Sequence, residues 1–181
     1  MLKKSVLVGF CVALLTPALS VLAGMDPALM VYWPLDEQSG NIAKDMSGKG
    51  NDGTVSAGPT WVAGKLNGAL RFAGAGDVRG PYVPLNNRTF TIAMWINPVL
   101  TGSQILFSQV QSGSTNLSLH LRLGGPSSTD APVNGIRFGF YNNDLDSPAN
   151  ILQSNNWYHV VFWYNFEAQR RRIYLNGVQI A

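Results

Sequence analysis

The segment Leu117-Ser-Leu-His-Leu-Arg-Leu123, followed after a polar break by Ile136-Arg-Phe-Gly-Phe140, decides the fold. Large apolar residues alternate with polar or small ones in both segments, and this period of two places successive side chains on opposite faces of a β-strand. The same alternation runs through residues 90–96. Strands with one apolar face need a second sheet to cover that face. The pattern therefore predicts an all-β protein built as a sandwich of two antiparallel sheets.

The rest of the chain repeats this organisation of short strands and polar turns. Further strand candidates are Leu29 to Leu35, Ala69 to Ala73, Tyr82 to Leu85, Gln104 to Val110, Trp157 to Tyr164 and Arg171 to Asn176. Clusters of Gly, Asn, Asp, Ser and Pro separate them and predict loops at 47–53, 74–81, 124–135 and 142–150. No internal repeat and no shift in composition divides the chain, so we expect one domain.

The first 23 residues have the pattern of a secretory signal peptide. Lys3 and Lys4 precede a ten-residue apolar run, Val6 to Leu15, and small residues lead to a cleavage site after Ala23. The run is too short to span a membrane, which takes about 20 apolar residues. We therefore expect export without a membrane span, to the periplasm, the cell surface or the medium. The single cysteine, Cys11, lies in this segment, so the mature chain would have no disulfide and no cysteine-bound metal.

Charge and composition exclude several functional classes. The net charge is +3 for the whole chain, and signal cleavage would remove two of the lysines. A nearly neutral chain with only 13% charged residues does not predict a nucleic-acid partner. The apolar content of 46% also argues against intrinsic disorder.

Four segments together resemble one known family. They are Val31 to Gly40, the Asp45-Met-Ser-Gly-Lys-Gly-Asn-Asp-Gly53 loop, Trp61 to Phe72, and the pair Asn156 to Val160 with Ile173 to Val178. Their order and sequence resemble the concanavalin A-like, laminin G-like jelly-roll domains. The resemblance implies a concanavalin A-like jelly-roll sandwich over residues 24–181, and carbohydrate or glycoprotein recognition, or adhesion.

The resemblance also implies additional structure after the Asn176-Gly177 turn. Members of the family normally continue through a final strand that pairs beside the first one, and here only four residues follow that turn. We therefore expect the domain at 24–181 to lack its last strand or strands. We also expect the natural chain to be longer, and further domains in it would be compatible with the sequence.

Catalytic groups are sparse, so we expect no enzyme. Glycosidases need two carboxylates about 5–10 Å apart across a sugar cleft. The chain has two glutamates, Glu37 and Glu167, while Asp144 and Asp146 fall in an expected loop. No G-x-S-x-G motif is present, and neither histidine has a partner at metal-binding spacing.

The Asp45–Gly53 loop is the candidate metal site. Calcium takes six to eight oxygen ligands from carboxylates, amides and carbonyls in tightly turning loops. Asp45 and Asn51 offer such oxygens, and Asp36 approaches from the preceding segment. A structural Ca²⁺ is a candidate occupant of this loop; the alternative is that these side chains only cap turns.

Candidate sugar ligands cluster at Tyr141, Asn142, Asn143 and Asp144, which combine an aromatic ring with amides and a carboxylate. Trp61 and Tyr82 are further aromatic candidates. We expect the other tryptophans, at positions 33, 95, 157 and 163, to pack in the core. We expect the three consecutive arginines at 170–172 to form a solvated hairpin edge.

The sequence thus favours an exported, non-catalytic module that binds a carbohydrate or glycoprotein. Two alternatives remain: a passive structural sandwich within a larger surface protein and, less favoured, a glycoside hydrolase.

Overall fold

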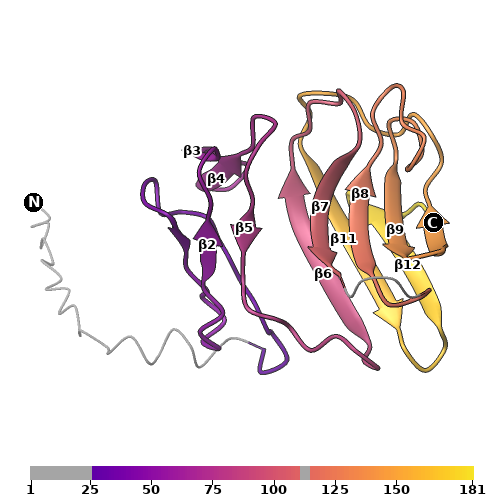
Figure 1. Cartoon of the computed structure of the whole chain (residues 1–181), viewed down its shortest axis with the longest axis horizontal. Coiled ribbons are helices and arrows are strands. Elements are labelled where there is room, and N and C mark those ends of the chain that lie inside the picture. Colours follow the sequence, from indigo (N-terminus) through magenta and orange to yellow (C-terminus); the bar gives the residue numbers. More distant parts are fainter. Residues whose placement is uncertain (1–25, 111–114) are drawn as a thin grey trace, which may run out of the picture. The chain divides into compact units, whose positions relative to one another are not determined.

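The computed structural model describes residues 26–110 and 115–181, and every regular element in these ranges is a β-strand (Figure 1). The all-β prediction is therefore confirmed. The predicted signal peptide, 1–23, and Cys11 lie outside the described residues. The chain divides between Pro81 and Tyr82 into two compact units, here called unit 1 and unit 2 and described separately. No helix among the described residues is long and apolar enough to cross a membrane.

Unit 1 contains a small sheet and a hairpin. The sheet has the order β1 (Ile42–Ala43), β2 (Gly53–Val55), β5 (Val78–Arg79), and the hairpin pairs β3 (Thr60–Ala63) with β4 (Gly68–Arg71), all antiparallel. Trp33 lies over Gly53 and Gly80, where a Cβ on either glycine would meet its ring. Its indole N–H donates to the carbonyl of Asn51 at 2.9 Å. Trp33 is therefore a packing residue, as predicted.

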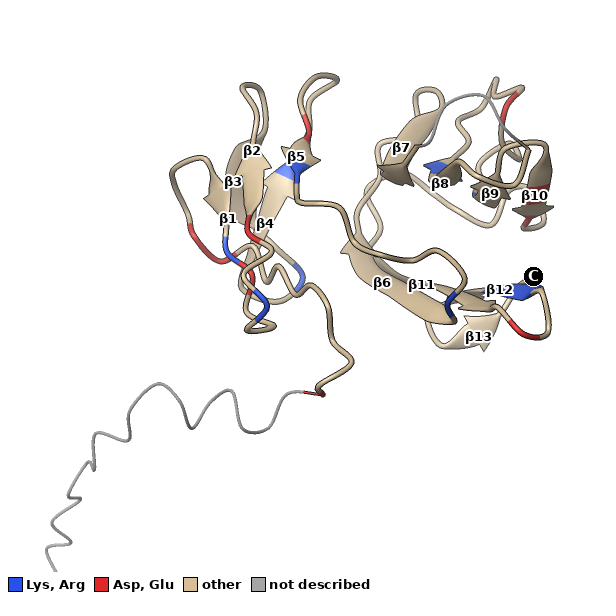
Figure 2. Ribbon diagram, turned by 60° about the horizontal axis from the view of Figure 1, so that its bottom comes forward, with Lys and Arg blue, Asp and Glu red and all other residues tan. Residues whose placement is uncertain are grey.

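Unit 2 is the predicted two-sheet sandwich, and Figure 2 shows its layers end-on. One sheet has the order β10 (Asn143–Asp146), β9 (Ile136–Phe140), β8 (Leu119–Leu123), β7 (Gln104–Gln109). The other has the order β13 (Val178–Gln179), β12 (Arg170–Leu175), β11 (Tyr158–Asn165), β6 (Phe90–Ile96). All pairings are antiparallel.

The apolar faces found by alternation fill the space between these two sheets. Leu121, Leu123, Ile136 and Phe138 of one sheet are fully buried, and so are Val160, Phe162 and Ile173 of the other. Phe138 meets Phe162 edge-on with ring centroids 5.6 Å apart. Because every residue of this core cluster lies between 85 and 181, unit 2 contains its own hydrophobic core.

The Asn176-Gly177 turn behaves as its sequence predicts. Both residues have left-handed backbones, with φ of 49° and 83°, and Leu175 pairs with Val178 across the turn. A two-residue turn with positive φ at both positions matches the twist of the flanking strands.

Two predicted strands are wrong, and proline is the shared reason. Leu29 to Leu35 contains Pro34, and Leu35 takes a left-handed φ of 63° that a strand cannot continue through. Tyr82 to Leu85 contains Pro84, and its Val83 bonds the side-chain amide of Gln109 rather than a neighbouring strand.

The predicted loop at 142–150 contains strand β10, which pairs with β9 from Phe140↔Asn143 to Arg137↔Asp146. Asn142 has a φ of 57°, so a two-residue turn suffices to reverse the chain. The loop prediction is therefore wrong for residues 143–146. These residues form a strand with a charged outward face, and their polar composition did not indicate it.

Two predictions about surface residues also need correction. Trp95 is 41% exposed on the outward side of β6, beside the ring of His159, rather than packed inside. Arg171 is not a solvated edge residue, since its guanidinium donates to the carbonyls of Phe138 and Asn143 in the opposite sheet.

Candidate functional site

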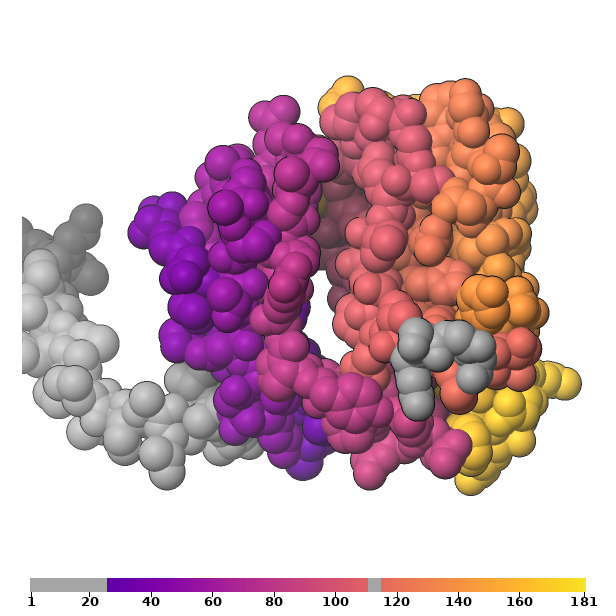
Figure 3. Space-filling model, in the orientation of Figure 1, coloured from indigo at the N-terminus to yellow at the C-terminus, as the bar shows by residue number. Residues whose placement is uncertain are grey.

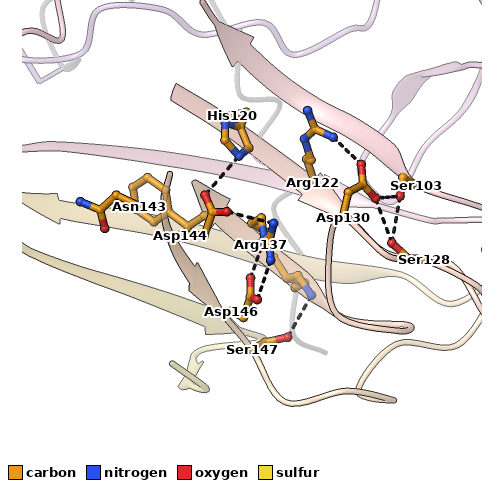
Figure 4. Close-up of polar contacts among 12 residues, drawn as sticks. Ser103, His120, Arg122, Ser128, Asp130, Arg137, Asn143, Asp144, Asp146 and Ser147 are labelled. Atoms are coloured by element: carbon orange, nitrogen blue, oxygen red, sulfur yellow. Dashed lines mark hydrogen bonds and ion pairs between the residues drawn. The ribbon is translucent and has the colours of Figure 1, made fainter. Parts of the chain in front are cut away.

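The outward side of the β7–β10 sheet carries several ion pairs of unit 2, and Figure 4 shows how they meet. We define the charged face as His120, Arg122, Arg137, Gly139, Asp144 and Asp146. Cross-strand pairing places them in two rows, His120–Gly139–Asp144 and Arg122–Arg137–Asp146. In the space-filling view, β7, β8 and β9 lie on the side of unit 2 that is turned toward the viewer (Figure 3).

The first row depends on the glycine at its centre. His120 Nε2 lies 3.3 Å from Asp144 Oδ1, directly above Gly139, and His120 Nδ1 lies 2.9 Å from the Ser118 carbonyl. A Cβ at position 139 would collide with both the histidine nitrogen and the carboxylate oxygen. Gly139 therefore allows the His–Asp contact to form across β9.

Arg137 connects the two rows. Its Nη1 lies 2.9 Å from Asp144 Oδ2, while Nε and Nη2 each donate at 2.8 Å to the two oxygens of Asp146. The hydrogen bond to Asp146 raises the pKa of Arg137 above its ordinary value, burial opposes the rise, and the charge of Asp144 adds to it. A permanently charged guanidinium thus holds both carboxylates of β10 in fixed positions.

A third carboxylate, that of Asp130, extends the face beside Arg122. Asp130 accepts hydrogen bonds from the hydroxyls of Ser103 and Ser128, and Arg122 Nη1 lies 2.5 Å from its Oδ2. The Ser103 hydrogen bond is the main reason that the pKa of Asp130 lies below 3.8, its ordinary value. Arg122 Nε is buried and has no hydrogen-bond partner among the described residues.

The four predicted sugar ligands do not form one site. Tyr141 and Asn142 occupy the β9–β10 turn, where Tyr141 is 48% exposed. Asn143 follows and turns to the opposite side of β10, where it bonds Asn116 and Arg171. Of the four, only Asp144 belongs to the charged face.

Arg171 reaches the rear of the same strand pair from the opposite sheet. Its guanidinium lies 5.3 Å from the ring centroid of Phe140 and donates to the carbonyl of Asn143 at 2.6 Å. Burial lowers the pKa of Arg171 from its ordinary value, although nearby Asp144 and Tyr164 oppose this. The residue therefore supports β10 from inside the sandwich.

The predicted calcium loop is organised by hydrogen-bond donors. Asp45 Oδ1 accepts from the backbone N–H groups of Tyr32 and Ser47, and Oδ2 accepts from the Ser47 hydroxyl and the Asn51 N–H. Partial burial, the largest single influence, raises the pKa of Asp45, but these hydrogen bonds outweigh it and lower the pKa below 3.8. Donors already occupy both oxygens.

The other two predicted metal ligands point elsewhere. Asp36 accepts from the Gly68 N–H and the Asn67 amide, and the Asn51 amide donates to the Met30 carbonyl. Within residues 26–110 and 115–181, no group of three His, Cys, Asp or Glu residues is placed to hold a metal ion. As placed, Asp36, Asp45 and Asn51 do not fit a Ca²⁺ cage, which requires converging oxygens without competing donors.

Sequence reasoning missed the most connected residues of the charged face. Arg122, Arg137 and Asp146 carry no motif, and their proximity depends on the register of three strands. The alternation Asn143-Asp-Leu-Asp146 was the available signal, because it places both aspartates on one face once the segment is read as a strand.

Comparisons with known proteins agree with this architecture. A family model described as the Concanavalin A-like lectin/glucanases superfamily, of the laminin G type, matches residues 72–181. The match spans all of unit 2 and more than half of the chain. Searches of curated proteins and of solved structures return no match.

Proposed function

Because the chain belongs to the concanavalin A-like lectin/glucanase superfamily, we propose that this lectin-like binding module recognises a carbohydrate through the charged face of unit 2. The observation that carries the proposal is the double row of fixed donors and acceptors across β8, β9 and β10. Sugar hydroxyls are both donors and acceptors, and such paired groups can bond neighbouring hydroxyls with little reorganisation.

The charge balance of the face favours a neutral glycan. Asp144, Asp146 and Asp130 supply three carboxylates, against the guanidinium groups of Arg122 and Arg137. An anionic ligand would meet these carboxylates at short range, whereas hydroxyl groups can donate to them. Tyr141, exposed in the turn beside Asp144, offers a ring on which a sugar could stack.

We further propose that the module is not catalytic. Asp144 and Asp146 are two residues apart on one strand face, roughly 7 Å along β10, which is within the range of glycosidase pairs. Arg137, however, bonds one oxygen of Asp144 and both oxygens of Asp146, while His120 faces the other oxygen of Asp144. These contacts leave neither carboxyl free to exchange a proton with a glycosidic oxygen. Incubation with oligosaccharides should release no new reducing ends.

A glycan array comparing three proteins tests the proposed function. The wild-type protein should bind a subset of immobilised neutral glycans. Arg137→Lys, which loses the two-pronged contact with Asp146, should weaken that signal about tenfold or more. The matched control is Arg79→Lys, because Arg79 Nε makes the same 2.8 Å contact with Asp77 in unit 1. This control should bind like the wild type.

The alternatives predict different array results. Binding confined to sulfated or carboxylated glycans would contradict a neutral ligand. Absence of binding to every glycan would favour the passive structural sandwich. Equal loss in both arginine variants would show that the signal does not depend on the charged face.

The proposed place of action is outside the cytoplasm, at the cell surface, in the periplasm or in the medium. The support is the sequence of residues 1–23, with its two lysines, apolar run and small residues before Gly24. Mass spectrometry of exported protein should find an N-terminus near Gly24, and exported material that retains Met1 would contradict this.

A further inference from the structure

Unit 1 contains an open hollow of about 680 Å³, which lies between the segment 35–40 and the β3–β4 hairpin. Among its lining residues are Leu35, Asp36, Gln38, Trp61, Asn67 and Gly68. Three of these six precede the hairpin and three belong to it, and all lie before residue 72, where the family match begins. The hollow therefore shares no residue with the charged face, and its function does not depend on the function proposed there.

Two anchors hold the walls of the hollow. At one end the indole N–H of Trp61 donates to the Gly40 carbonyl at 2.9 Å. At the other end Asp36 Oδ1 accepts from the Gly68 N–H at 2.9 Å, and Oδ2 accepts from the Asn67 amide at 3.3 Å. A Cβ on Gly68 would collide with the Leu35 carbonyl, so the glycine permits this close approach. The hollow is thus fixed by the fold.

The backbone around the hollow is strained. Leu35 and Gln38 both have a φ of 63°, and Asn67 has a φ of 50°. Left-handed backbone is unfavourable for residues with a Cβ, above all for large apolar ones. Such residues gather at ligand-binding sites, where the surrounding structure enforces them. Two such residues, Leu35 and Gln38, line this one hollow, whereas asparagine adopts this conformation readily at Asn67.

The lining chemistry suits a ring with one apolar face and a polar edge. The indole N–H of Trp61 is already bonded, so the ring offers the hollow its apolar surface. Each carboxylate oxygen of Asp36 accepts one hydrogen bond and retains capacity for another. The Gln38 amide adds a donor and an acceptor. The volume falls within the range of about 300–1,000 Å³ that is typical of small-molecule sites.

From these features we propose that the hollow of unit 1 is a second binding site, which takes a single neutral pyranose unit. The apolar face of the sugar lies against Trp61, and its hydroxyls bond Asp36, Gln38 and Asn67. Asp36 is the one charged side chain among the lining residues, so its carboxylate disfavours acidic sugars.

Nuclear magnetic resonance on the full chain can test this directly. The chain has five tryptophans, and Trp61→Phe identifies which indole N–H signal belongs to Trp61. The probes are the methyl glycosides of glucose, galactose and mannose. At least one should shift the Trp61 signal saturably, and Arg137→Lys on the charged face should leave that response unchanged.

A substitution that preserves the backbone tests the polar edge. Gln38→Gly removes the amide, and glycine adopts the left-handed φ without strain, so the unit should stay folded. It should weaken glycoside binding about fivefold, the effect of one lost hydrogen bond. The matched control is Gln169→Gly, at another left-handed glutamine, with a φ of 50° in a turn of unit 2. This control should bind like the wild type.

Three results would overturn the proposal. They are a Trp61 signal that no glycoside shifts, an unchanged affinity in Gln38→Gly, and a stronger response to choline than to any of the glycosides. The last result would identify the hollow as a site for organic cations, which also favour an aromatic ring beside a carboxylate.

Discussion

Asp45 has the densest set of hydrogen bonds of any carboxylate in unit 1, with four donors from Tyr32, Ser47 and Asn51. Asp45→Ala leaves the backbone donors without their acceptor, so we expect a loss of about 1–3 kcal/mol in stability. Asp26→Ala, which removes a single exposed hydrogen bond to Ala28, should change stability by less than about 0.5 kcal/mol. Urea denaturation of both variants measures the difference.

The same carboxylate predicts a dependence on pH. Its pKa in the folded state lies below its ordinary value of 3.8. A lowered folded-state pKa contributes stability that is fully present above the unfolded value and lost as the pH falls through the folded value. The stability gap between wild type and Asp45→Ala should therefore be constant near neutral pH and shrink below about pH 3.8. A gap that widens on acidification would contradict the hydrogen-bonding role of Asp45.

Arg171 and Arg170 form a natural comparison, since they are adjacent in sequence and differ in environment. Arg171 donates across the sandwich to Phe138 and Asn143, whereas Arg170 is exposed. Arg171→Met should lower the free energy of unfolding by about 2 kcal/mol, because it leaves two carbonyls without donors. Arg170→Met should lie within about 0.5 kcal/mol of wild type. Similar melting temperatures for the two variants would contradict the structural role of Arg171.

At the scale of elements, three glycines in unit 2 should respond differently to alanine. A Cβ at Gly139 collides with the side-chain ends of His120 and Asp144, which can move aside. A Cβ at Gly124 collides with the backbone carbonyl of Pro132, which cannot move aside. A Cβ at Gly102 meets nothing within 4 Å. We expect Gly139→Ala to lose glycan binding with a modest drop in melting temperature. Gly124→Ala should be strongly destabilised, and Gly102→Ala should match the wild type in both measurements.

The strands that sequence could predict are those with one apolar face. Residues 90–96 and 136–140 are strands with the bounds that their alternation gives, because burial of that face enforces the period of two. Strand β10 escaped prediction because Leu145 is its one large apolar residue, and its pairing with β9 is set by a tight turn at Asn142. Leu29 to Leu35 failed in the opposite way, because its apolar composition predicted a strand that Pro34 and the left-handed Leu35 prevent. The backbone N–H of Tyr32 instead donates to the Asp45 side chain.

The candidate site was less predictable than the fold. Asp144 could be named from its loop-like, polar surroundings, but Arg137 and Arg122 come from strands read as sandwich core. Their outward side chains reach Asp146 and Asp130 through cross-strand register, which depends on the assembled sheet. The lack of space for a Cβ at Gly139 likewise results from side chains on β8 and β10, the two strands that pair with β9.

At the scale of the whole molecule, the position of the hydrophobic core predicts that unit 2 can fold without unit 1. Every buried core residue of the sandwich lies between 85 and 181, so residues 82–181 contain the complete core cluster. We expect this fragment, produced alone, to unfold in one cooperative thermal transition. A broad transition with exposed apolar surface, detected by dye binding, would show that the sandwich needs unit 1.

The most direct test of the central claim is backbone amide shift mapping of the full chain, saturated with the neutral glycan that gives the strongest array signal. The largest shifts in unit 2 should fall on β8, β9 and β10, at and beside His120, Arg137 and Asp144. In Arg137→Lys the same shifts should require about tenfold more glycan or more, while the spectrum otherwise remains that of a folded protein. Saturating glycan that leaves the charged face unperturbed, or that shifts only the β6–β11–β12–β13 sheet, would contradict recognition by this face.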